Sequence, residues 1–324
     1  GRDLESYAGL IGKDKIEYRR DLTASPFPPF AEITYWWRLE SSGDGTRETE
    51  PITFRYIDNR YTWRSLRRDE LIVHWISGGT DVMASALDVG TQALEDLDHA
   101  LQPPESGELH IYMYPSQSEL RSAMQLAGYS WAGGITYPEL NVMLIAIPAT
   151  DEAVVRMKRT IPHELTHQML HSRLGTQGYR NLPVWLDEGL ATNFEQSPNA
   201  TYALTLQESQ SLIPLHALCD PFPDDAAIAR LSYAQSQSVV SYLREVYGWS
   251  TVRDLLDVYA DGVGCEAGVV RVLGIDLNQL ERRWSQWLKD GDTSIEPLNP
   301  PAWRETWNRT RNWVDLLIES AGPW

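Results

Sequence analysis

Short stretches of alternating apolar and polar residues occupy the first part of this 324-residue chain. Between residues 30 and 80 these stretches are rich in β-branched and aromatic side chains, and turn-forming residues separate them. The pattern predicts four short strands in a small antiparallel sheet or sandwich, at residues 31–39, 52–57, 61–64 and 71–76. His74 lies among the apolar residues of the fourth stretch, which favours a packed histidine over a functional one.

From Asp81 the apolar residues recur at every third or fourth position, which is typical of helices. A helix is expected over residues 81–101, and a mainly helical second half follows Ala191. Between them, strands are predicted at residues 109–114, 131–137 and 142–147, a short helix at 119–126, and a longer helical run from Asp151. Pro162 falls inside that run, and because proline cannot donate a backbone hydrogen bond, we expect a kink or a fresh helix start there.

These changes of pattern divide the chain into four segments. Residues 1–29 are a mixed N-terminal segment, 30–80 a β-rich module, 81–298 an α+β domain with a mainly helical C-terminal half, and 299–324 a Trp-rich tail. We expect the tail to be a docked helix or a path toward an anchor. No run of 18 apolar residues is present, so no transmembrane span is predicted. No signal segment opens the chain, and its start at Gly1 without a Met favours a trimmed protein.

Composition narrows the possible partners. The formal net charge is −17 and the sequence pI about 4.8, which argues against nucleic acid or an anionic membrane as partner. Thirteen Trp and fifteen Tyr against five Phe fit either aromatic-rich core packing or a binding surface. The sequence does not determine the oligomeric state.

The chain holds two cysteines, Cys219 and Cys265, so it can form one internal disulfide at most. Each lies in a loop-like stretch. An exported protein would pair them, whereas a cytosolic protein would leave them reduced. We predict that they are paired.

The candidate chemistry centres on His163-Glu164-Leu165-Thr166-His167. On a helix the two histidines are one turn apart on the same face, and together they can bind one Zn²⁺. Glu164 can then act as a general base toward a water on the metal. Such a short motif also arises by chance, so the assignment needs a third ligand. Glu188 is the candidate, because it follows His167 by 21 positions on a predicted second helix that opens after Pro183.

With both motifs present, the chain resembles the gluzincin superfamily of zinc metallopeptidases, in which a second helix carries the glutamate ligand in a W-L-x-E-G-x-A context. Here that context stands as residues 185–191. The nearest likeness is to the peptidase MA-like families of bacterial, often surface-located proteins, over about residues 81–287. The resemblance implies a thermolysin-like catalytic domain over 81–298. It also implies a peptide or protein substrate and a secreted or cell-surface location.

The resemblance also implies a set of roles. Zn²⁺ would be held by His163, His167 and Glu188, with water in the fourth place, and Glu164 would be the general base. Tyr233, near the start of a predicted helix, is the candidate donor to the oxyanion, with a core tyrosine as the competing interpretation. A catalytic pair of Glu164 and Tyr233 is therefore expected beside a metal site of three ligands.

Further residues near the motif have two interpretations each. Asp187 could orient a ligand histidine or cap its own helix. His171 would line the groove or be structural, because a fourth protein ligand would close the metal site. The Gly133-Gly134 pair could leave an edge strand open to a peptide, or form an ordinary turn.

Glu139 bears on the type of peptidase. In the aminopeptidase branch, a glutamate in a G-x-M-E-N segment upstream of the histidines holds the free amino terminus. Here the segment is Gly-Ile-Thr-Tyr-Pro-Glu-Leu-Asn. The departure favours a solvated Glu139, and an endopeptidase over an aminopeptidase.

A rival hypothesis is a cell-surface binding or scaffold protein on a peptidase fold, with structural zinc or suppressed catalysis. The β module and the Trp-rich tail support it. The complete set of His163, Glu164, His167 and Glu188 opposes it, since a decayed site usually loses one of these. Zinc-dependent hydrolysis of a non-peptide amide or ester is a third, weaker alternative.

Overall fold

The computed structural model describes residues 9–11, 15–21, 27–41, 45–105, 107–124, 134–197, 200–209 and 211–290. The Trp-rich tail and most of the N-terminal segment lie outside these residues, so the expectations for them are untested. Within the described part, no helix combines the length and the apolar composition that crossing a bilayer requires.

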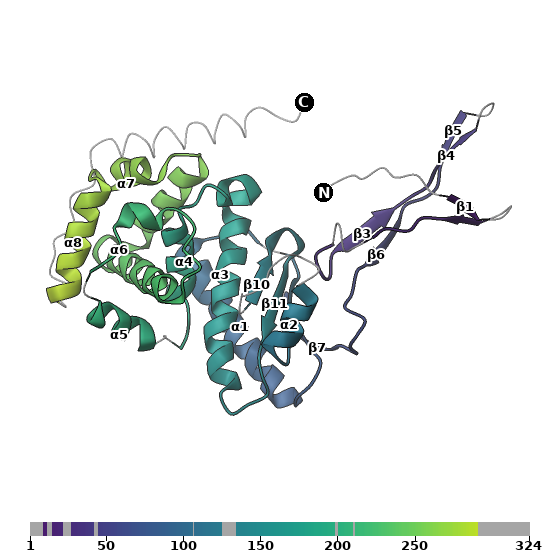
Figure 1. The fold of residues 1–324 in the computed structure, drawn as a ribbon, viewed down its shortest axis with the longest axis horizontal. Helices are drawn as coiled ribbons and strands as arrows, with labels where there is room; N and C mark the ends of the chain where they lie inside the picture. Colours follow the sequence, from purple (N-terminus) through teal and green to yellow (C-terminus); the bar gives the residue numbers. More distant parts are fainter. Residues whose placement is uncertain are drawn as a thin grey trace.

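A five-stranded sheet forms the centre of the body, in the order β10-β11-β9-β8-β7. The inner strands β8, β9 and β11 are parallel, and the edge strands β7 and β10 pair antiparallel to their neighbours. Helices α1 and α3 pack on one face, and α2 contacts β9 and β11 (Figure 1). The five strands of this sheet and the three helices are β7 Arg64–Arg68, β8 Leu71–Trp75, β9 Leu109–Tyr114, β10 Gly134–Tyr137, β11 Val142–Ala146, α1 Thr80–Leu101, α2 Gln117–Met124 and α3 Ala153–Tyr179.

The predicted mainly helical half is confirmed. Its longest helix, α6, breaks at Gly248, where φ is 79°. Helix α4 packs so closely on α6 that a Cβ at Gly189 would lie 2.6 Å from the carbonyl oxygen of Ser236. This close approach fixes the helix that carries Glu188. The elements are α4 Val184–Asn193, α5 Ala200–Glu208, the 3₁₀ turn η3 Leu215–Leu218, α6 Ala226–Ala260, α7 Cys265–Leu273 and α8 Leu277–Asp290.

The N-terminal strands form three two-stranded antiparallel ribbons on one side of the body (Figure 1). The predicted antiparallel N-terminal strands are confirmed, but residues 30–80 do not form one small sheet or sandwich, because β7 and β8 belong to the central sheet. The apolar run of β8 is buried almost throughout, as is typical of a parallel strand covered on both faces. The ribbons pair β1 Gly9–Ile11 with β2 Lys15–Glu17, β3 Glu32–Tyr35 with β6 Ile52–Arg55, and β4 Arg38–Ser41 with β5 Gly45–Glu48.

The β3–β6 ribbon has one apolar and one polar face. Ile33 lies opposite Phe54, and Tyr35 lies opposite Ile52, so these four side chains share a face. Tyr35, Ile52 and Phe54 are 40–52% exposed. The ribbon joins the body at Phe30, whose ring stacks on Tyr112.

His74 is packed, as predicted. Its ring stacks on Tyr112, and its Nε2 lies 3.0 Å from His110 Nδ1. Burial, the neighbouring His110 and the charge of Arg55 lower the pKa of His74 to about 4. The pKa of His110 is also lowered, by burial and by Arg55, against the opposing charge of Glu108.

This histidine pair predicts an acid-sensitive fold. Between about pH 6.5 and 4 the unfolded chain binds a proton at His74 that the folded chain does not, so stability falls as the pH drops through this window. For His74 the loss approaches about 3 kcal/mol. Urea unfolding across this range should show a shallower decline for His74→Gln than for the parent protein. Parallel declines would contradict the prediction.

Helix α3 runs through Pro162, so the expected fresh start there is wrong. Non-helical angles occur instead at Gly175, where φ is 68° and ψ 167°. The helix tolerates the proline because the carbonyl of Lys158, four residues earlier, accepts a hydrogen bond of 2.8 Å from the backbone N–H of Gln196. The bond that proline cannot make is thus replaced from another segment.

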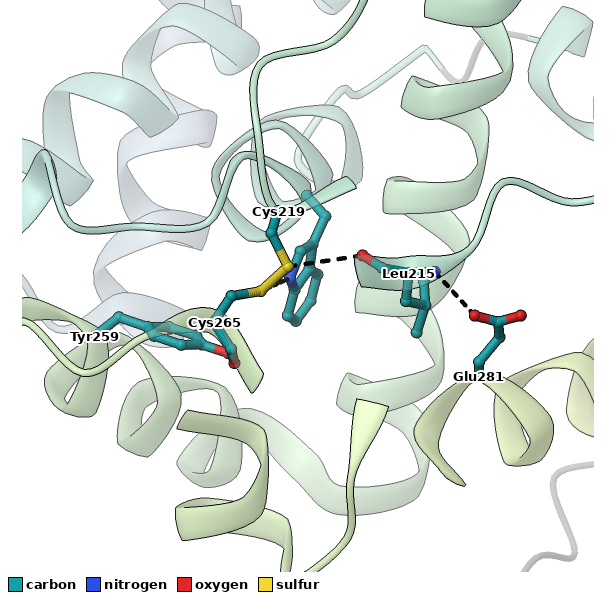
Figure 2. The surroundings of a disulfide bond; sticks show 6 residues. Leu215, Cys219, Tyr259, Cys265 and Glu281 are labelled. Carbon is teal, nitrogen blue, oxygen red and sulfur yellow. Dashed lines mark hydrogen bonds between the residues drawn. A yellow bond between two sulfur atoms is a disulfide. The ribbon is translucent and has the colours of Figure 1, made fainter. Parts of the chain in front are cut away.

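Cys219 and Cys265 form a disulfide, as predicted. It joins the end of η3 to the first residue of α7, beside Leu215 and Tyr259 (Figure 2). The indole Nε1 of Trp185, on α4, lies 3.4 Å from Cys265 Sγ. The disulfide therefore stabilises the surroundings of α4 at Trp185, which lies three residues before Glu188.

Candidate metal centre

Helices α3 and α4 bring the three predicted metal ligands together. His163, His167 and Glu188 each offer one ligand atom, and these atoms all lie within 4.8 Å of one another. Glu188 Oε2 is 3.5 Å from His163 Nε2 and 3.8 Å from His167 Nε2. Among the described residues, this is the one group of at least three such side chains that could hold a metal ion.

The donor set fits zinc. Two nitrogens and one carboxylate oxygen are its usual ligands, and two ligands of a tetrahedral Zn²⁺ lie about 3.3 Å apart when each bond is about 2.0 Å. The observed separations from Glu188 Oε2 are close to that value. This oxygen is also buried without a hydrogen-bond partner, which is unfavourable unless an ion or a solvent molecule satisfies it.

Two carboxylates bind the far nitrogens of the histidines. Asp187 Oδ1 lies 2.8 Å from His167 Nδ1, and Glu195 Oε1 lies 3.3 Å from His163 Nδ1. Tyr179 donates a hydrogen bond of 3.1 Å to Asp187 Oδ2. Each carboxylate can fix the tautomer that presents Nε2 to a metal. Asp187 therefore contacts a ligand histidine, His167, which fits the first of its two interpretations, orientation of that histidine.

Glu195 was missed by the sequence reasoning. It follows Glu188 by seven positions, which is two helical turns, so a continued helix would place both on the same side. That spacing was the available signal. The residue lies just beyond α4, where its side chain is 4% exposed.

The carboxylates set the charge of the site. Burial disfavours a charged His163, but the neighbouring carboxylates of Glu188 and Glu195 raise its pKa well above the usual value. Burial opposes a charged His167 as well, yet Asp187 and Glu188 raise its pKa to about 9. Burial alone would raise the pKa of Glu188, but the histidines and the hydroxyl of Tyr233 lower it. The negative groups therefore favour a cation between them.

Glu164 is held by the edge strand β10. Thr136 donates a hydrogen bond of 2.6 Å to Glu164 Oε2. A Cβ at Gly134 would lie only 2.5 Å from Glu164 Oε1. The strand thus approaches the general-base candidate through a glycine, and β10 lies at the edge of the sheet as expected. Gly133 lies outside the described residues.

Gly134→Ala should displace Glu164 without touching the three ligands. A shift of about 1 Å in a catalytic group lowers turnover on the order of 100-fold, while zinc content should stay at the parent level. The control is Gly79→Ala, where the added methyl meets no atom within 4 Å. Peptidase assays and metal analysis of both variants test this, and parent-like turnover of Gly134→Ala would contradict it.

Tyr233 lies on α6 and faces the cluster. Its ring packs against Tyr202 and Phe222, and its hydroxyl is close enough to Glu188 for each group to shift the pKa of the other. Burial, followed by the charge of Glu188, raises its pKa. The phenol therefore stays protonated and can donate a hydrogen bond.

His171 and Glu139 lie outside the ligand cluster. His171 Nε2 is 3.1 Å from Thr176 Oγ1, and Thr176 donates to Glu139 Oε1 at 3.4 Å. Glu139 is exposed on the 3₁₀ turn η2 (Pro138–Leu140) after β10. These contacts fit the solvated interpretation of Glu139 and the structural interpretation of His171.

The fold and the cluster together define a gluzincin-type metallopeptidase architecture. A family model described as the Peptidase MA superfamily matches residues 90–290, which is more than half of the chain. The chain therefore belongs to the Peptidase MA superfamily, and the predicted resemblance is confirmed. Membership supports a zinc-dependent hydrolase.

Two solved structures align with part of this chain at low identity. The M1 zinc metallopeptidase from Deinococcus radiodurans aligns with 16% identity and a TM-score of 0.42, over 79% of this chain and 61% of its own. A mutant of that enzyme aligns with 14% identity and a TM-score of 0.40, over 79% and 62%. The chain thus spans about three fifths of the length of these structures. A search of curated proteins finds no match.

Proposed function

We propose that this protein is a zinc-dependent metallopeptidase that cleaves peptide bonds within chains. The observation that carries the proposal is the cluster of His163, His167 and Glu188 with Glu164 beside it, held by the edge strand of the sheet. When bound by the three ligands, zinc would act as a Lewis acid toward the scissile carbonyl and the attacking water.

Residues of the chain would then transfer the proton, orient the general base and stabilise the oxyanion. Glu164 takes the proton of the attacking water and later delivers it to the leaving amine. Thr136 orients that carboxylate through its hydroxyl. Tyr233, kept protonated by burial beside Glu188, donates to the developing oxyanion. Strand β10 lies at the edge of the sheet that the described residues form, where an extended peptide backbone would pair with it.

The edge strand supports internal cleavage. If the G-x-M-E-N pattern of the aminopeptidase branch is laid over residues 133–137, Thr136 stands at the position of the glutamate. Threonine carries no charge for a free amino terminus, and its hydroxyl is already bonded to Glu164. Glu139 lies beyond the strand and accepts from Thr176. No described residue of β10 itself carries a carboxylate.

Digestion of a mixed peptide library, half of it N-acetylated, tests both parts of the proposal. Zinc-loaded protein should cut internal bonds in free and acetylated peptides alike, and Glu164→Gln should cut neither. Removal of single residues from free amino termini alone would establish an aminopeptidase. Equal digests from the parent and the variant would refute the peptidase proposal for these substrates.

The second candidate is a binding or scaffold protein on a peptidase fold. The exposed apolar face of the β3–β6 ribbon, with Tyr35, Ile52 and Phe54, favours it. The intact Glu164 with its own hydrogen-bond donor opposes it, because structural zinc has no use for a general base. Bound zinc without cleavage of any library peptide would favour this candidate.

A secreted or cell-surface location is part of the proposal. The disulfide between Cys219 and Cys265 supports it, since disulfides persist mainly in oxidising compartments. Labelling of free thiols in protein taken directly from its source tests the point, and two reactive thiols would refute it.

A further inference from the structure

The segment after α4 is bound residue by residue to one stretch of α3. Glu195 Oε1 lies 3.3 Å from His163 Nδ1, and the backbone N–H of Gln196 donates to the Lys158 carbonyl at 2.8 Å. The next carbonyl, of Ser197, accepts from Arg159 Nε at 3.3 Å. Three consecutive residues therefore contact the stretch 158–163, which ends at the first metal-ligand candidate.

The central bond of this set exists because of Pro162. In a regular helix the Lys158 carbonyl would accept from the N–H of residue 162, which proline lacks. The proline ring also crowds that carbonyl, which favours an outward tilt toward another donor. Gln196 supplies the donor. The side chain of Gln196 binds a second helix as well, because its Nε2 donates to the Val89 carbonyl of α1 at 3.0 Å.

The carboxylate of Glu195 has few fixed contacts of its own. Its Oε2 is buried without a hydrogen-bond partner, and Arg159 Nε lies 3.7 Å from that oxygen. Its contact with His163 is therefore set by the backbone on which it lies, and Gln196 fixes that backbone.

We infer that Pro162 and Gln196 are positioning residues for the metal centre, and that they hold Glu195 against His163. Pro162 frees a carbonyl inside α3, Gln196 binds it, and the adjacent Glu195 fixes the tautomer and direction of the histidine. The inference rests on the proposed zinc site. It explains why a proline lies in the middle of α3, the helix that carries the candidate ligand His163.

The test is the affinity for Zn²⁺ alone, measured against a competing chelator, together with the thermal unfolding of the metal-free protein. Pro162→Ala restores a helical donor and should leave the unfolding temperature equal or higher. The same change should weaken zinc binding by about 10-fold, within the range for loss of an outer partner of a ligand. Gln196→Ala keeps the backbone N–H that binds the Lys158 carbonyl and removes only the side-chain bond to Val89, so it should weaken zinc binding less than Pro162→Ala does. Asn181→Ala, which removes an amide–carbonyl bond of 3.1 Å to Ala260 elsewhere, should not weaken zinc binding.

A double variant separates positioning from general destabilisation. In Glu195→Ala nothing remains to be positioned, so adding Pro162→Ala should change zinc affinity by less than about twofold. Effects that multiply in the double variant would overturn the inference, as would parent-like affinity of Pro162→Ala. Affinity losses that only follow the unfolding temperature would overturn it too. A parent protein that binds no zinc would refute the proposed function and this inference together, whereas the other outcomes leave the proposed function intact.

Discussion

Replacing Glu188 with alanine is expected to remove most of the zinc that the protein binds. The change deletes one of three protein ligands, so the affinity should fall by more than the roughly 10- to 100-fold that an outer-shell loss causes. The two histidines would remain, each backed by its own carboxylate. They would form a two-ligand site, which is too few for a stable tetrahedral centre.

Metal analysis after dialysis against a weak chelator measures this effect. The matched control is Glu139→Ala, because Glu139 is exposed and lies outside the ligand cluster. That variant should keep one zinc per chain. Stoichiometric zinc in Glu188→Ala would refute the assignment of the third ligand, and loss of zinc in Glu139→Ala would show that the cluster is defined wrongly.

The elements that carry the site were predictable because their signals are local. Strand β9 covers the predicted residues 109–114, and α1 begins one residue before the predicted start at Asp81. The spacing of His163 and His167 is itself a helical signal. Glu188 was predicted from its place on a second helix after Pro183 together with the resemblance, since no local periodicity links it to a residue 21 positions earlier.

What escaped prediction depends on contacts between distant segments. β8 pairs with β9 across the whole of α1, and β7 pairs with β8 at the edge of the same sheet. Short strands carry no local signal for their partners. Pro162 was expected to kink or restart the helix, but α3 continues through it. A donor 34 positions later, Gln196, replaces its missing bond. The contact of Thr136 with Glu164 escaped prediction for the same reason, because it requires the edge strand β10 to pack against α3.

Glu164→Gln is expected to keep the zinc and to abolish turnover. The amide has nearly the shape of the carboxylate and can still accept from Thr136, which lies 2.6 Å from Glu164 Oε2. The three ligands are unchanged, so metal content should match the parent. An amide cannot take a proton from water, and the loss of a general base lowers turnover by about 10²- to 10⁴-fold.

Turnover of one peptide from the library, at equal zinc content, measures the effect of Glu164→Gln. Thr136→Val is the companion variant, because it leaves the carboxylate in place and removes only its hydrogen-bond donor. Its turnover should fall less, by about 10-fold, a loss near the strength of one charge-assisted hydrogen bond. Turnover of Glu164→Gln near the parent value would remove the general base from the mechanism. A larger loss of turnover in Thr136→Val than in Glu164→Gln would also contradict the assignment of Glu164 as general base, since the carboxylate would then be the less important of the two groups.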